Sequence, residues 1–152
     1  MAKKDKAPMF VRVANVLTLT LLRAGLPLVG PGLVIGNYPM YLLTVRGRKS
    51  GQPRTVALAL IERNGKRYLG SAFGIVDWVR NLRAAGEAIL TRGRRSETVT
   101  ARELPTDEAA LILRADIKRN PFARYFGVTA DSSLEEFERA AVSHPLFVLE
   151  KQ

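Results

Sequence analysis

Three cations and two hydroxyl groups gather in one short segment, residues 47–55 (GRKSGQPRT). Its two glycines permit a tight turn that exposes backbone N–H groups. Lys49 and Arg54 supply charge and Ser50 supplies a neutral donor, and this combination suits an anion such as phosphate. The segment is not a Walker loop, because the Gly-x-x-x-x-Gly-Lys spacing and the following helix are missing. Two interpretations stay open on the residues alone: an anion-binding turn, or a solvated basic hairpin turn, which is the commoner feature.

A second segment combines small residues with an aromatic and an amide side chain. Residues 70–74 (GSAFG) end an expected strand, and small residues there let a planar ligand approach the backbone closely. Trp78 and Asn81 lie three positions apart, on one face of a short helix. The alternative is that Trp78 is a core anchor and Asn81 a surface cap, since a single Trp is usually a packing residue.

The composition excludes several kinds of chemistry. The 152 residues include no Cys and one His, so a disulfide, a Cys nucleophile, a thiolate metal site and a His-based zinc site are excluded. We therefore expect no metal. His144 precedes Pro145 without a partner motif, and we expect it to be structural.

The charge raises the question of a nucleic-acid partner. Lys and Arg number 24 against 14 Asp and Glu, a net charge of +10, which is the electrostatic pattern of a nucleic-acid-binding protein. However, the cations are scattered from Lys3 to Lys151. No helix-turn-helix, zinc finger or aromatic RNP-like strand is visible in the sequence. We therefore expect no nucleic-acid partner.

Short strands and helices alternate along the chain and must position these segments. Strands are expected over residues 40–45, 55–61, 67–73, 88–91, 96–103 and 145–149. A hairpin is expected at Asn64-Gly65 and another at residues 92–94. Helices are expected over 77–85, from Thr106 to near Asn120-Pro121, and over 133–142 after a Ser132–Glu135 capping box. About six mainly antiparallel strands with helices between them predict an α+β fold, a small barrel with helices packed outside.

The first part of the sequence predicts an apolar helix over residues 9–22. Its few polar residues share one narrow sector, so the helix either packs against its own domain, the commoner outcome, or rests on a membrane or lipid surface. Arg23, Gly25 and Pro27 break the run before it could span a bilayer, and no signal-peptide cleavage motif follows. We expect one cytoplasmic domain over residues 1–152, with the helix and a Gly/Pro-rich loop in 1–36 and the barrel in 37–152.

Two of these motifs together resemble a known family. Residues 43–55 (LTVRGRKSGQPRT), followed by a hairpin and by Trp78-x-x-Asn81-Leu82-Arg83, are similar to the deazaflavin-dependent nitroreductases. These proteins form class A of the split-barrel oxidoreductases that use reduced coenzyme F-420. The resemblance covers roughly Tyr38 to Glu103, and the combination of motifs is more specific than either motif alone. It implies a split β-barrel with an N-terminal helix, in agreement with the strand count.

The resemblance also implies which residues bind the cofactor. Its phosphate and acidic tail would be held by Arg48, Lys49, Ser50, Gly51 and Arg54. The deazaflavin would run along the backbone of Thr55, Val56, Ala57 and Leu58. The groove would be completed by Gly70, Ser71, Ala72, Phe73, Asp77, Trp78 and Asn81. Such a cofactor supplies the hydride itself, so the protein needs no nucleophile.

The sequence departs from the family pattern on the substrate side. Relatives often have a longer loop with His-Pro before the Trp, and their aromatic pocket segment is reduced here to Phe122, Tyr125 and Phe126. Tyr125 is the candidate catalytic residue, because a phenol O–H can stabilise or protonate an acceptor oxygen; the alternative is that it packs within this cluster. The implied partner is a small apolar acceptor: a quinone, a nitroaromatic or an activated alkene. A cofactor-free lipid or fatty-acid carrier of the same fold is the alternative function.

Overall fold

The computed structural model of the protein describes residues 34–35 and 38–152. The helix expected over residues 9–22 lies outside the described residues. None of the helices that the structure describes is long and apolar enough to cross a membrane.

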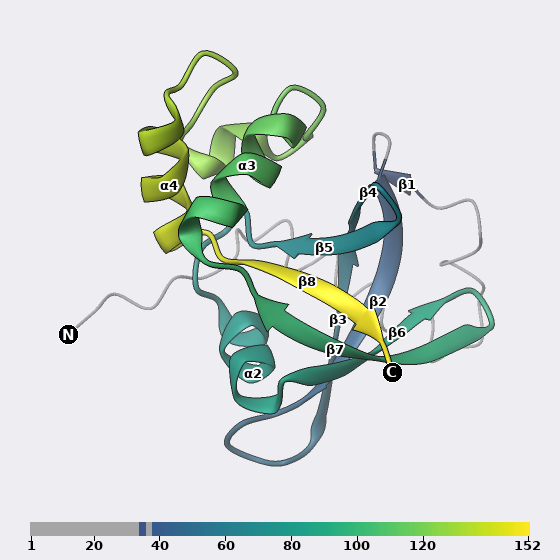
Figure 1. The fold of residues 1–152 in the computed structure, drawn as a ribbon. Helices are drawn as coiled ribbons and strands as arrows, with labels where there is room; N and C mark the ends of the chain where they lie inside the picture. Colours follow the sequence, from purple (N-terminus) through teal and green to yellow (C-terminus); the bar gives the residue numbers. More distant parts are fainter. Residues whose placement is uncertain (1–33, 36–37) are drawn as a thin grey trace.

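Among the described residues, eight strands form one antiparallel sheet (Figure 1). They are β1 (Val34–Ile35), β2 (Tyr38–Arg46), β3 (Pro53–Ala59), β4 (Ile61–Arg63), β5 (Lys66–Gly70), β6 (Glu87–Arg92), β7 (Arg95–Glu103) and β8 (Leu146–Lys151). The order is β1-β2-β6-β7-β8-β5-β4, and β3 pairs with the other side of β2. Hairpins join β2 to β3, β4 to β5 and β6 to β7.

The sheet curls into a barrel through β3 and β4. β3 pairs with β2 and β4 pairs with β5, while Leu60 alone separates β3 from β4. The expected strand over residues 55–61 is therefore divided at Leu60, and the two-residue β1 is added to the expected number. The six strands that the sequence predicts form a closed ring in the order β2, β3–β4, β5, β8, β7, β6. The predicted α+β split barrel is therefore confirmed.

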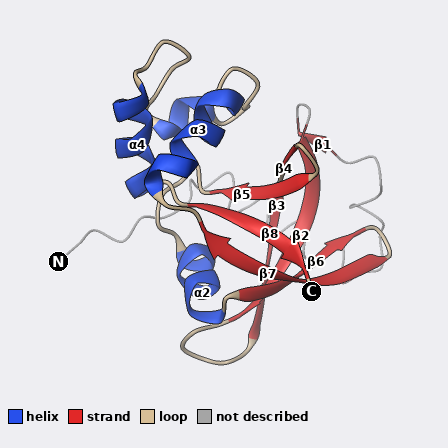
Figure 2. Ribbon diagram, viewed as in Figure 1, coloured by secondary structure: helices blue, strands red, loops and turns tan. Residues whose placement is uncertain are grey.

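In the part of the chain that the structure describes, three α-helices and a short 3-10 helix lie outside the barrel (Figure 2). They are α2 (Asp77–Ala85), α3 (Thr106–Asp116), η1 (Ala123–Phe126) and α4 (Leu134–Ser143). Helices α3 and α4 pack together at one end of the sheet, and α2 lies at another place, against β2 and β6. The barrel core, centred on Leu43, Leu90 and Phe147, also buries Val79 and Leu82 of α2. Burial of this apolar face holds α2 against the barrel.

Several element ends differ from the sequence expectation. The capping box of α4 is formed by Ser133 and Glu136, one residue later than expected, because the Ser132 hydroxyl instead accepts the Thr129 amide at 2.9 Å. Helix α3 begins at Thr106, but the residue preceding it is Pro105 and no side chain caps it. Similarly, Asp77 lies in the first turn of α2 and does not cap it.

Candidate functional site: a basic turn clamped to a helix

The segment 47–55 forms the hairpin turn between β2 and β3. The Gly47 amide donates to Gln52 O at 2.8 Å, and the Gly51 amide donates to Gly47 O at 2.9 Å. Gly51 has a φ of +72°, which favours glycine. A Cβ at Gly47 would lie 3.0 Å from the Ser50 hydroxyl and 3.1 Å from Gln52 O, so the first glycine is required by close packing. The turn is therefore compact and internally bonded.

Asn81 of α2 clamps this turn to the body of the protein. Its Oδ1 accepts the Arg48 amide at 3.2 Å and the Arg48 guanidinium at 2.7 Å. The same guanidinium lies 3.3 Å from the Asp77 carboxylate. Asn81 is buried, only 6% exposed, in the middle of α2. The interpretation of Asn81 as a surface cap is therefore wrong, and its place is under the turn.

The clamp divides the turn residues into two groups. Arg48 is occupied by Asn81 and Asp77, so it holds the turn and is less available to a ligand than expected. By contrast, Lys49, Ser50 and Arg54 are exposed. The amides of Lys49 and Ser50 have no hydrogen-bond partner among the residues that the structure describes. Two free amides, a hydroxyl and two cations make a donor set suited to an anion.

Strand β3 leads away from the turn toward the rest of the expected site. It carries residues 55–58 and pairs along one edge with β2; no other described strand pairs with it. Val56 and Leu58 are half-buried against the barrel core. Thr55 lies on the opposite face, with its hydroxyl 2.9 Å from that of Thr44. The structure thus places the expected β3 residues in a continuous strand beside the turn.

The segment 70–74 is a tight turn that leads from β5 toward α2. Ser71 is buried; its hydroxyl donates to Gly74 O and its amide donates to Pro145 O at 3.0 Å. This turn ends β5 at Gly70, earlier than expected. A Cβ at Gly70 would lie 3.1 Å from Leu146 Cδ1, so packing of β5 on β8 gives a reason of its own for a glycine at this position.

His144 contacts the same segment, 70–74, through its imidazole ring. Its Nδ1 lies 3.0 Å from Ser71 O, and its ring lies 5.1 Å from the ring of Phe126. The contact with a carbonyl oxygen means that Nδ1 carries the proton in this arrangement. His144 thus has the structural place that the sequence predicts.

An aromatic wall joins Tyr125 to the segment 70–74. We give this name to Phe73, Phe122 and Tyr125. The Phe73 ring lies 4.9 Å from Tyr125 and 5.7 Å from Phe122, both edge-on. Arg124 donates to the Tyr125 hydroxyl at 2.7 Å, and its guanidinium lies 4.8 Å from the Tyr125 ring. Tyr125 therefore packs within an aromatic cluster, as the alternative interpretation expects, and its hydroxyl also accepts from Arg124. Ala72, the neighbour of Phe73 in the chain, is half-buried. Trp78 is not part of this wall, and its ring centroid lies 6.2 Å from that of Phe147 in the barrel core.

A chain of hydrogen bonds, buried at one end and partly buried at the other, positions this wall, and sequence reasoning missed it. Tyr38 donates to Asp116, which is 1% exposed. Asn120 donates to the other oxygen of Asp116 at 3.0 Å, and its own Oδ1 accepts the Phe122 amide at 2.9 Å. Burial raises the pKa of Tyr38 well above its usual range, and its hydrogen bond to Asp116 raises it further. Tyr38 thus stays protonated as a donor, and the chain fixes the loop that carries Phe122.

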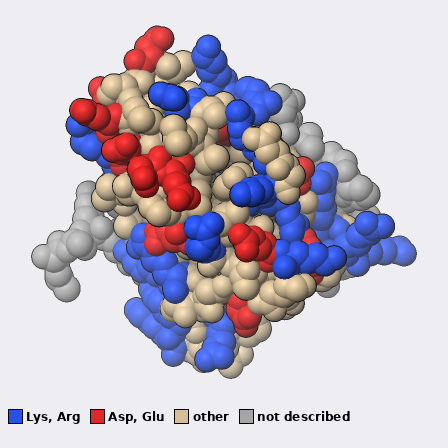
Figure 3. Space-filling view, viewed as in Figure 1, with Lys and Arg blue, Asp and Glu red and all other residues tan. Residues whose placement is uncertain are grey.

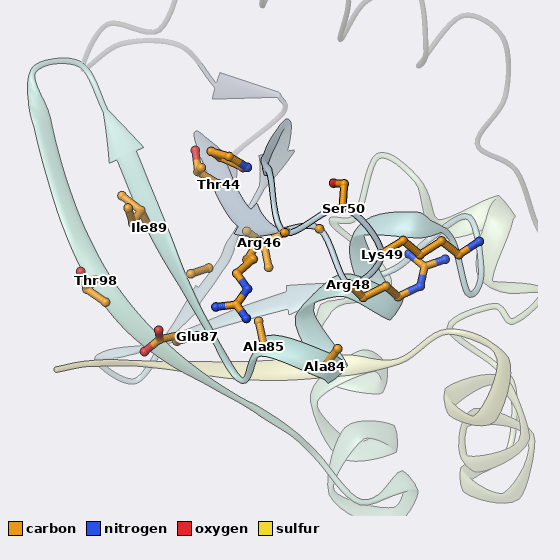
Figure 4. A pocket seen from close by; sticks show the side chains of 15 residues that line it. Thr44, Arg46, Arg48, Lys49, Ser50, Ala84, Ala85, Glu87, Ile89 and Thr98 are labelled. Carbon is orange, nitrogen blue, oxygen red and sulfur yellow. The ribbon is translucent and has the colours of Figure 1, made fainter.

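A cavity of about 840 Å³ lies on the other side of the basic turn (Figure 4). It is lined by residues 47–51, by Thr44 and Arg46 of β2, and by the end of α2, β6 and β7. It does not include residues 55–58, 70–73 or Trp78. The turn therefore forms a border between two regions, the β3 side and this cavity.

Charge is unevenly distributed over the surface. Figure 3 shows carboxylates gathered over α3 and α4, while Lys and Arg gather toward the end where α2 and the β2–β3 turn lie. Among the described residues there is no cluster of three His, Asp or Glu side chains that could hold a metal ion. The site is therefore built from cations, amides and aromatic rings.

Comparisons with known proteins agree with this arrangement. Residues 28–131 match the family model of the F-420H(2)-dependent quinone reductases. The fold is similar to a solved F-420H2-dependent reductase (FDR-A), with 27% identity, a TM-score of 0.53, and coverage of 78% of this chain and 100% of that one. A structure described as a domain-swapped dimer has 26% identity, a TM-score of 0.55, and coverage of 93% and 97%. Comparison with curated proteins gave no match.

A more distant structure shares the fold alone. It is a protein from Listeria innocua described as a pyridoxamine 5'-phosphate oxidase, with 10% identity and a TM-score of 0.51. The shared coverage is 74% of this chain and 83% of that one.

Proposed function

The chain belongs to the F-420H(2)-dependent quinone reductase family, and we propose that it reduces a small apolar quinone at the aromatic wall. It is an oxidoreductase, and its cofactor is reduced coenzyme F-420. The resemblance found in the sequence is thereby confirmed. The acceptor and the roles of individual residues are the proposal.

The residues present fit this coenzyme. It carries a phosphate and a chain of glutamates at one end and a flat apolar ring system at the other. Lys49, Arg54, the Ser50 hydroxyl and two free amides suit the anionic end. The half-buried face of β3 and the segment around Phe73 suit the apolar end. The observation that carries the proposal is the pair of free amides between two exposed cations, held in place by Asn81.

The protein's own tasks are binding, orientation and proton supply. When bound, the reduced coenzyme supplies the hydride. The turn fixes the anionic end, and the aromatic wall offers an apolar surface on which a quinone can lie without water. A quinone that gains one hydride and one proton becomes a hydroquinone. The Tyr125 O–H can donate to the acceptor oxygen on which negative charge develops, while Arg124 orients that hydroxyl.

An acceptor panel tests this function. The protein is mixed with reduced coenzyme F-420 and a naphthoquinone, a nitroaromatic or an activated alkene, and reappearance of the oxidised coenzyme is followed. We expect the quinone to have the highest kcat/KM, with reduced FMN and NADPH inactive as hydride sources. A nitroaromatic or alkene preferred over every quinone would overturn the choice of acceptor. No oxidation with any acceptor would overturn the function.

Tyr125→Phe tests the proton donor. Removal of the hydroxyl should reduce turnover roughly tenfold to a hundredfold, or about 1.4–2.7 kcal/mol, with coenzyme affinity unchanged. Tyr41→Phe is the matched control, since its hydroxyl donates to Glu62 at 3.1 Å away from the wall. Wild-type turnover in Tyr125→Phe would remove this residue from the mechanism and leave solvent as the proton source.

A further inference from the structure

The β2–β3 hairpin carries cations on both of its faces. Val45 is paired with Arg54, so Arg54 projects on the face that Val45 turns toward the barrel core. Arg46 is the next residue along β2 and therefore projects on the opposite face, with Thr44. Lys49 lies between them at the tip. The basic residues thus form a path from one face of the hairpin, over its tip, to the other.

The second face opens into the 840 Å³ cavity, and Arg46 occupies its middle (Figure 4). Its guanidinium extends toward Ala85 and Glu87. Arg46 is exposed and forms no hydrogen bond or ion pair with any described residue. The acid of the cavity, Glu87, accepts from the neutral Gln152 amide at 3.0 Å and keeps its negative charge. Asp77 lies against Arg48, so Arg46 and Lys49 face Glu87 alone among the lining residues, and the lining keeps a net positive charge.

We propose that this cavity receives the glutamate tail of the coenzyme, with Arg46 as the cation that contacts its carboxylates. The inference rests on the proposed function, and it adds that the affinity for the coenzyme depends on the number of glutamates in its tail. Residues 48–51 line the cavity and also belong to the phosphate-binding turn, so an anion held at the tip stands at the cavity mouth. A polyanion continuing from that point into the cavity meets Arg46. The opposite, core-facing side of the hairpin, with Val56 and Leu58, is left for the apolar end of the coenzyme.

The electrostatics favour the cavity for such a tail. A volume of about 840 Å³ is in the range of small-molecule sites, so it can accept a short peptide-like chain. Arg46 gains a partner without breaking an existing ion pair among the described residues. Since Arg46 is exposed, its contact with each carboxylate is screened, and the gain per glutamate is modest and sensitive to salt.

Coenzyme forms that differ only in the number of tail glutamates test the proposal. Binding of the oxidised forms is measured by fluorescence titration to wild type, to Arg46→Gln and to Arg102→Gln, a control in which an exposed cation of β7 is removed. In wild type and in Arg102→Gln, a longer tail should lower the Kd about twofold to fivefold at low salt. In Arg46→Gln this dependence should disappear, while the Kd for the shortest form stays near that of wild type.

Two outcomes separate this inference from the function on which it rests. The same dependence on tail length in Arg46→Gln as in wild type, or no dependence in wild type, would overturn the cavity as the tail site. Failure of every coenzyme form to bind would overturn the proposed function itself. The deazaflavin riboside, which lacks the phosphate and the tail, should bind equally to all three proteins.

Discussion

Replacement of Asn81 by leucine should loosen the basic turn from inside the protein. Asn81 is buried. Its Oδ1 accepts two hydrogen bonds from Arg48 in the turn, one from the neutral backbone amide and one from the charged guanidinium. Leucine keeps the approximate shape and the helical conformation of the residue but removes both acceptors. The Arg48 amide then loses its partner, and the guanidinium keeps Asp77 alone.

The size of the effect follows from these two bonds. A neutral hydrogen bond contributes about 0.5–1.5 kcal/mol, and a charged one contributes about 1.5–3 kcal/mol. The Arg48 side chain is 23% exposed, so water replaces part of what it loses. We therefore expect a loss of about 1–2 kcal/mol in the free energy of unfolding. If the loosened turn must be ordered again by the ligand, the Kd of coenzyme F-420 should rise about fivefold to thirtyfold.

Urea denaturation and fluorescence titration measure the two effects on the same variant. Asn81→Asp is the matched control, because it keeps an oxygen at the position of Oδ1 and should hold the turn through Arg48. We expect its coenzyme affinity to lie closer to that of wild type than to that of Asn81→Leu. Wild-type stability together with wild-type affinity in Asn81→Leu would refute the clamp.

Two further predictions concern stability. Tyr38→Phe leaves the buried Asp116 carboxylate short of a donor and should lower the free energy of unfolding by about 1–3 kcal/mol, measured by urea denaturation; an unchanged midpoint would contradict the chain of hydrogen bonds. Glu97→Gln should cost about 1 kcal/mol at neutral pH, because its hydrogen bond with Arg67 lowers the pKa of the Glu97 carboxyl. A lowered pKa stabilises the fold above the ordinary glutamate pKa of about 4.3, so the difference between wild type and variant should shrink as the pH falls below that value. A difference that is constant across this range would show that the ion pair does not contribute.

Local signals in the sequence predicted much of the fold. The Asn64-Gly65 turn places Asn64 at φ +51° and Gly65 at φ +74°, which is the geometry that this dipeptide favours between two strands. The glycines of the basic turn permit a tight turn, as expected, and this too depends only on neighbouring residues. The bounds of the helix over residues 77–85 were predicted correctly, although Asp77 lies in its first turn and does not cap it. Each of these features depends on residues close together in the chain.

The contacts that organise the site are long-range, and the sequence did not reveal them. Arg48 and Asn81 are 33 positions apart, and Tyr38 and Asp116 are 78 positions apart. Nothing in either neighbourhood indicates the partner, since a lone Asn in a helix or a Tyr in a strand has many ordinary roles. The close packing of Gly70 against Leu146 is likewise not visible in the sequence, because it depends on the pairing of β5 with β8. Barrel closure through Leu60 depends in the same way on pairing partners distant in sequence.

The most direct test of the central claim is coenzyme binding by a protein that lacks the two exposed cations of the turn. Lys49→Ala with Arg54→Ala is compared with Lys66→Ala with Arg102→Ala, which removes the same charges from β5 and β7. Loss of two charged contacts at exposed positions should weaken binding of coenzyme F-420 by about 2–4 kcal/mol in the first double variant, with little change in the second. The deazaflavin riboside should bind alike to both. Equal Kd values for coenzyme F-420 in the two double variants would contradict the assignment of the basic turn as its anion site.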